Sequence, residues 1–68
     1  MNPLLDRGAV RIRVQDIQAI SGDDESAHSA EDELYRDVLR YYANGGTDPE
    51  LAKEALKTLD LEFERWCA

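Results

Sequence analysis

The sequence has only one cysteine, two prolines, one histidine and one tryptophan among its 68 residues. A single cysteine excludes an intrachain disulfide and a cysteine-only metal cage. No apolar run approaches the roughly 20 residues that cross a bilayer, and no signal peptide is evident. Basic residues are also few, with 8 Lys and Arg against 15 Asp and Glu, so the net charge is −7. This balance argues against direct binding to nucleic acid or to an anionic membrane, and we expect a cytoplasmic protein.

The apolar content is sufficient for one small domain. Hydrophobic residues make up 43% of the chain, which does not match the composition of a disordered protein. A chain this short buries only about 60% of the surface that it exposes when unfolded. Small scaffolds of this kind often depend on a partner or on oligomerisation for stability. We expect residues 1–8 to form an irregular arm and residues 9–68 to form one helical domain.

The spacing of apolar residues predicts an all-α fold, a small bundle of three to four helices. The first segment is ambiguous, because apolar and polar residues alternate over 9–14 as in a short strand. Apolar residues also recur at helical spacing from Val10 to Ile20, which favours a helix over 9–20. No second strand-like run is available to pair with a strand here, so we favour the helix.

Two further helices have clear boundary signals. The second begins near Asp23, Asp24 or Ser26 and ends at Ala43, before Asn44-Gly45-Gly46. The third begins within Thr47-Asp48-Pro49-Glu50, with either Thr47 or Asp48 as its cap. Near Asp60 this helix either continues or gives way to a short fourth helix. The expected core consists of Val14, Ile17, Leu34, Val38, Leu39, Leu56, Leu59, Phe63 and Trp66.

The most unusual segment runs from Asp23 to Glu33 and holds six acids, one histidine and no Lys or Arg. Three interpretations compete for it. The first is a solvated helix start, in which the acids favour the positive end of the helix dipole. The second is a recognition surface for a basic protein. The third is a metal site built from Asp24 or Glu25, His28 and Glu31 or Asp32, with Glu25, His28 and Asp32 as the candidate ligands.

The second interpretation rests on the spacing of the acids along the helix. On a helix Asp24, His28, Glu31 and Asp32 share one face, with Glu25 beside them, so that carboxylates recur along the axis as charges do on a nucleic-acid backbone. A metal site would have at most three ligands from one helix, and no other histidine could complete it. Tyr41 is the best candidate for an exposed aromatic anchor. The predicted partner-binding residues are Asp23, Asp24, Glu25, His28, Glu31, Asp32 and Tyr41.

Catalysis is not expected, because the lone histidine has no nucleophile in a suitable geometry, and no cofactor motif is present. The 68-residue length, the acidic block from Gly22 to Glu33 and the C-terminal Phe63-Glu64-Arg65-Trp66-Cys67-Ala68 resemble the small acidic proteins encoded by phages and prophages. That class includes anti-CRISPR and other anti-defence inhibitors, several of which look like DNA to their targets.

The sequence therefore predicts a non-enzymatic inhibitor or DNA mimic that binds a basic, nucleic-acid-binding protein. Two alternatives remain open. One is a structural or regulatory homodimer that completes its core in trans, and the other is a metal-binding regulatory module.

Overall fold

The computed structural model describes residues 5–61 and 63, and its regular structure is helical. Helix α1 spans Arg7–Ala19, α2 spans Asp24–Ala43, and α3 spans Pro49–Leu56 and passes directly into the 3-10 helix η1, Lys57–Asp60. Because the described residues include no strand, the predicted all-α class is confirmed and the strand over 9–14 is wrong. Helix α1 begins two residues earlier than expected, since the side chain of Asp6 accepts a hydrogen bond from the Ala9 N–H at 2.8 Å and caps it.

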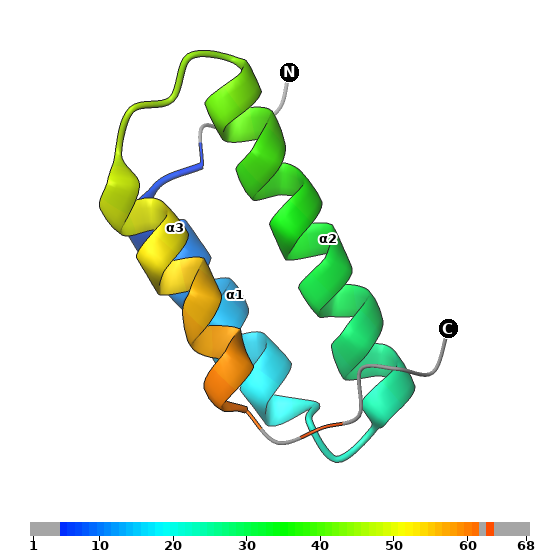
Figure 1. Ribbon diagram of the computed structural model, residues 1–68. Coiled ribbons are helices and arrows are strands. Elements are labelled where there is room, and N and C mark those ends of the chain that lie inside the picture. The colour runs from blue at the N-terminus through cyan, green and yellow to red at the C-terminus, as the bar shows by residue number, and fades with distance from the viewer. Residues whose placement is uncertain (1–4, 62, 64–68) are drawn as a thin grey trace.

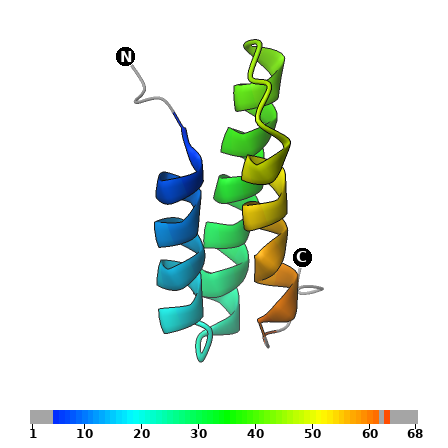
Figure 2. The same cartoon turned by 90° about the vertical axis from the view of Figure 1, so that its left-hand side faces the viewer.

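The three helices lie side by side, and each contacts the other two. Helices α1 and α3 run in the same direction, and α2 runs in the opposite direction (Figures 1 and 2). One end of the molecule therefore holds the turn of residues 20–23 between α1 and α2, which we name the turn end. The other end, the loop end, holds the loop of residues 44–48 and the N-termini of α1 and α3.

Two local structures form the loop end: the C-terminal end of α2 and the N-terminal cap of α3. Helix α2 ends in a Schellman motif, in which the Gly46 N–H donates to the Tyr41 carbonyl and the Gly45 N–H donates to the Tyr42 carbonyl. Gly45 has a φ of 95°, which only glycine adopts readily. Helix α3 then begins with Asp48 as its cap and Pro49 at its first position. Of the two caps that the sequence allows, Thr47 and Asp48, the structure has Asp48.

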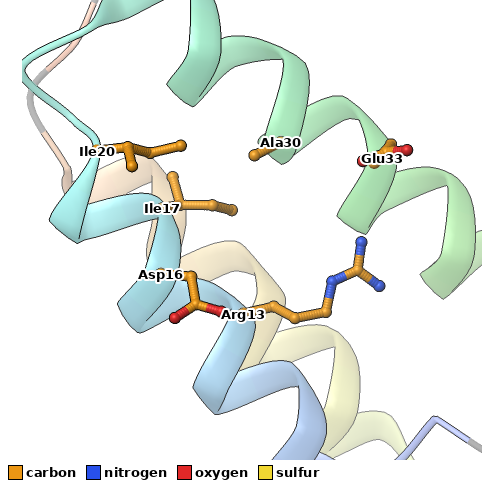
Figure 3. A pocket seen from close by; sticks show the side chains of 6 residues that line it. All are labelled: Arg13, Asp16, Ile17, Ile20, Ala30 and Glu33. Carbon is orange, nitrogen blue, oxygen red and sulfur yellow. The ribbon is translucent and has the colours of Figure 1, made fainter.

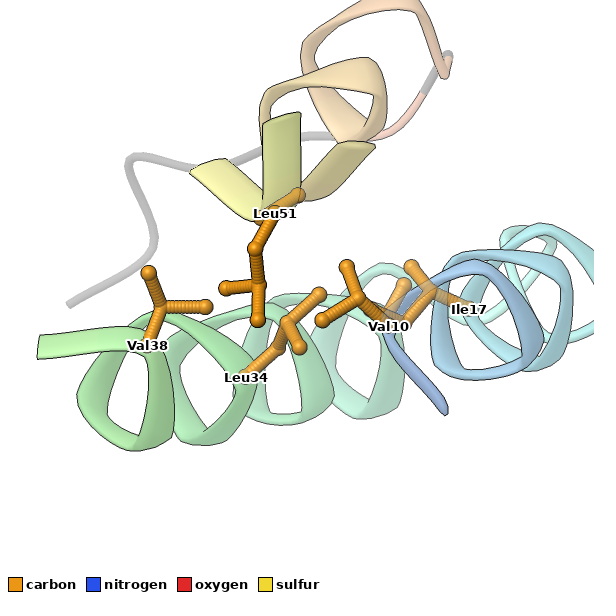
Figure 4. Packing of buried hydrophobic residues seen from close by; sticks show 7 residues of the cluster. Val10, Ile17, Leu34, Val38 and Leu51 are labelled. Atoms are coloured by element: carbon orange, nitrogen blue, oxygen red, sulfur yellow. The ribbon is translucent and has the colours of Figure 1, made fainter. Parts of the chain in front are cut away.

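The core is small and is built from short apolar side chains (Figure 4). Three expected core residues, Ile17, Leu34 and Val38, are buried, whereas Val14 and Phe63 are half-buried and pack against the core. Trp66 lies outside the described residues. The buried apolar residues are Val10, Ile17, Ala27, Leu34, Val38, Leu51 and Ala55.

Three of the residues expected in the core are instead on the surface. Leu39 is 70% exposed, Leu56 is 53% exposed and Leu59 is 57% exposed. Each of these leucines lies one position after a residue that points into the core. One position corresponds to about 100° around a helix, which turns the leucine side chain toward solvent. The inward positions are taken by the preceding residues, of which Val38 and Ala55 are apolar and Thr58 is a buried hydroxyl.

We expect Leu34→Ala to lower the free energy of unfolding by about 2–5 kcal/mol, because it leaves a cavity in the core. Leu56→Ala should change it by only about 0.5 kcal/mol or less, since the side chain is half in solvent. Urea denaturation followed by circular dichroism measures both values. Equal losses for the two variants would show that the inward face of α3 is assigned incorrectly.

Candidate functional site

The entire net charge of the protein lies in one segment. Residues 14–35 contain seven acids and no Lys or Arg, and the other eight acids are matched by the eight Lys and Arg of the rest of the chain. This segment is the second half of α1, the turn and the first half of α2, so the charge gathers toward the turn end. The seven acids are Asp16, Asp23, Asp24, Glu25, Glu31, Asp32 and Glu33.

Most of the basic side chains that the structure describes pair with carboxylates outside this segment. Of the seven Lys and Arg that the structure describes, six form an ion pair with Asp37, Asp48, Glu50 or Glu54, all outside residues 14–35. Several of these pairs join different helices. The interhelical pairs are Arg11–Glu54 at 3.2 Å and Arg13–Asp37 at 2.7 Å, and Arg7 at the start of α1 contacts Asp48, the cap of α3, at 2.7 Å.

The carboxylates of Asp37, Asp48 and Glu54 have depressed pKa values. Hydrogen bonding from Arg13 lowers the pKa of Asp37, and hydrogen bonding from Arg7 lowers that of Asp48. Hydrogen bonds from Arg11, and secondly from Lys57, lower the pKa of Glu54. These carboxylates serve the fold, and the acids of residues 14–35 form the candidate site.

Four of the predicted site residues are exposed on the surface of the turn end. Asp23 caps α2 by accepting hydrogen bonds from the Ser26 N–H and hydroxyl, and these bonds lower its pKa. Asp24, Glu25 and Asp32 are exposed on α2. His28 is half-buried, with its Nε2 atom 3.6 Å from the Oδ2 atom of Asp32. The structure thus places Asp24, His28 and Asp32 on one flank of α2, at successive turns of the helix.

Glu31 does not belong to this surface, and its assignment to the acidic face is wrong. Its exposed fraction is only 3%. Glu31 lies four residues after Ala27 and three before Leu34, both of which are buried, so it occupies a position on the inward row of α2. Helical spacing does group Glu31 with Asp24 and His28, but Glu31 lies at the edge of that face that is turned toward the core.

A second flank of the turn end carries two more exposed acids. Asp16 and Glu33 line a hollow between α1 and α2, together with Arg13, Ile17, Ile20 and Ala30 (Figure 3). The apolar side chains come from both helices, and the charged groups stand around them. Exposed carboxylates are therefore present on the α1 side of α2 as well as on the Asp24–Asp32 side.

The metal interpretation finds no support in the geometry. Among the described residues, no three His, Cys, Asp or Glu side chains come together in a group that could hold a metal ion. Glu25, His28 and Asp32 therefore do not form a ligand set.

Tyr41 has a structural position that the sequence did not indicate. Its hydroxyl oxygen accepts a hydrogen bond from the Asp48 N–H at 3.1 Å, and its ring packs edge-on against Tyr42 with centroids 4.9 Å apart. The residue is half-buried at the loop end, far along α2 from Asp24. The apolar side chains that are exposed on α2 and α3 are instead Leu39 and Leu56. Their one-position offset from the inward rows is the signal that could have identified them.

No described helix is both long enough and apolar enough to span a membrane. Comparison with protein-family models, with curated proteins and with solved structures reveals no match for the chain. We therefore infer the function from the charge, burial and contacts of the residues of this chain.

We expect stability to be constant from neutral pH down to about pH 5 and to fall below about pH 4. Asp37 and Asp48 have native pKa values below their ordinary 3.8, so they stabilise the fold above that pH, and the contribution is lost as pH falls through the native pKa. Thermal unfolding across this range measures the effect. Arg13→Gln should flatten the acid decline, and an unchanged decline in this variant would contradict the assigned role of the Arg13–Asp37 pair.

Proposed function

We propose that the protein is a non-enzymatic acidic binder that occupies a Lys- and Arg-lined groove on a nucleic-acid-binding protein, as an inhibitor of DNA-mimic type. The observation that carries the proposal is the segregation of charge. Residues 14–35 hold the whole net charge of −7 without a Lys or Arg, while the described cations other than Arg36 are paired elsewhere. Six of the seven acids are exposed, and an acidic surface of this kind attracts a basic partner over distances beyond contact.

The spacing of the exposed acids also suits such a groove. Asp24 and Asp32 are eight residues apart, which corresponds to about 12 Å along a helix, and Glu25 stands beside them. Asp23 adds a carboxylate at the tip of the turn end, where its capping role keeps it ionised. Charge complementarity of this kind provides association rate and orientation more than affinity, so an apolar anchor is also needed.

We expect the triple variant Asp24→Lys, Glu25→Lys and Asp32→Lys to lose its partner while keeping its helix content. All three side chains are exposed, so the change removes negative charge without disturbing the core. The experiment is a pull-down from lysate with quantitative mass spectrometry, followed by elution with duplex DNA. The wild-type protein should recover basic nucleic-acid-binding proteins, release them to DNA, and recover less as salt rises.

The control is Ala43→Lys, Thr47→Lys and Glu50→Lys, which adds positive charge at exposed positions of the loop end, outside residues 14–35. This control should keep the partner if the location of the charge matters, and should lose it if only the total charge matters. Retention of the same partner by the first triple variant at both low and high salt would refute the proposal.

A further inference from the structure

Three of the five exposed large apolar side chains are leucines on α2 and on the α3–η1 segment: Leu39, Leu56 and Leu59. The other two are Ile12 of α1 and Ile20, the residue that follows α1. Scattered exposed leucines are common in folded proteins, so exposure alone indicates nothing. Three exposed leucines on one side of the molecule, in contrast, would form an apolar patch of the kind that binds a partner.

The position of Leu39 follows from the contacts of its own helix. Asp37 of α2 pairs with Arg13 of α1, so that flank of α2 faces α1. Leu39 comes two residues later, about 200° around the helix, on the flank that faces α3. Tyr35 and Tyr42 confirm this direction, because the Tyr35 hydroxyl hydrogen-bonds Thr58 of η1 and the Tyr42 hydroxyl donates to the Asp48 carbonyl.

The same reasoning places the other two leucines. Glu54 of α3 pairs with Arg11 of α1, so that flank of α3 faces α1. Leu56 comes two residues after Glu54 and therefore lies on the flank that faces α2. Leu59 follows three residues after Leu56 on the same side. Leu39, Leu56 and Leu59, which we name the seam leucines, thus border the junction of α2 and α3; Figure 1 shows α3 in front of α1 and α2 beside them.

The seam leucines adjoin the acidic surface. Asp24, His28 and Asp32 lie at successive turns of α2 on the same flank as Tyr35 and Leu39. On α2 the exposed Arg36 stands between them, four residues after Asp32 and three before Leu39, so the apolar junction meets the acidic flank at this cation. A ligand that covers both needs an apolar stripe and a basic end.

Charge decides which occupant fits this surface. A second copy of the chain would bring a second net charge of −7, concentrated in the same segment. Of the described cations, Arg36 alone makes no ion pair, so a second copy offers little positive charge to the acidic flank. A basic helix presents the opposite sign over the whole flank.

We propose that the seam leucines and the Asp24–Asp32 flank together bind an amphipathic helix of the partner protein, with its apolar stripe on the leucines and its Lys and Arg on the carboxylates. The inference rests on the proposed function and supplies the apolar anchor that the proposed function requires. Binding of an amphipathic helix to an apolar surface is a recurring mode of peptide recognition.

The test uses two labelled peptides of about 18 residues made only of Leu and Lys, the length of a helix that spans several turns. In one peptide the leucines form a stripe at helical spacing, and in the other the same residues are arranged without a stripe. Fluorescence anisotropy gives the affinity of each. The wild-type protein should bind the striped peptide more tightly than the other, because only the striped peptide can cover the seam leucines.

We expect Leu39→Ala with Leu56→Ala to weaken binding of the striped peptide by roughly tenfold and to remove the preference between the peptides. The matched control is Ile12→Ala, since Ile12 is 59% exposed but lies on α1 two residues from the buried Val10, away from the junction. This control should bind as the wild type does. Circular dichroism checks that each variant is folded, and Leu59→Ala provides an independent test if the double variant unfolds.

The outcomes separate this inference from the proposed function. If the double leucine variant binds the striped peptide as tightly as the wild type, while the triple lysine variant does not bind it, the seam proposal is wrong and the acidic binder stands. If the triple lysine variant also binds normally, both proposals fail. A wild-type dimer in light scattering that the double leucine variant converts to monomer would overturn the helix-binding role, because a second copy would then occupy the seam.

Discussion

Asp48 is the residue on which the packing of the loop end depends. Its carboxylate caps α3 by accepting from the Glu50 N–H and pairs with Arg7 through two hydrogen bonds of 2.7 and 3.1 Å. Its backbone carbonyl accepts from the Tyr42 hydroxyl, and its N–H donates to Tyr41. One residue thus connects the start of α1, the end of α2 and the start of α3. A chain with so small a core needs such polar connections, because apolar burial alone provides little stability at this length.

This arrangement has a consequence for the other end of the molecule. Arg7, Arg11 and Arg13 are all engaged with carboxylates on α2, on α3 or at its cap, so the cations of α1 hold the helices together. The carboxylates that receive them lie outside residues 14–35. The exposed acids of residues 14–35 are therefore open to solvent or to a partner, because the described cations, Arg36 excepted, pair with carboxylates elsewhere in the fold. Structural and functional charge are separated along the helices.

Much of the fold could be predicted from local signals, and less of the site could. The end of α2 at Asn44-Gly45-Gly46 and the start of α3 at Asp48-Pro49 depend on local capping residues, so both can be predicted directly from the sequence. The residues that face the core cannot be read from local signals in the same way. Helix α2 has more apolar residues than one face can bury, and only its packing against the other two helices decides which of them point inward. That is why Leu39 was expected inside. Glu31 is predicted outside because it lies seven residues after Asp24 on the same face, and spacing alone does not show which edge of that face is turned inward.

The concentration of charge also links binding to stability. The acids of the first turn of α2, Asp24 and Glu25, favour the positive end of the helix dipole, but Asp32 and Glu33 lie beyond its reach and add mutual repulsion. A basic partner on this surface would relieve that repulsion, and a ligand that binds only the folded state stabilises it. The seam leucines act in the same direction, since covering them removes apolar surface from water. The features that weaken the isolated chain are thus the features that a basic, amphipathic partner would satisfy.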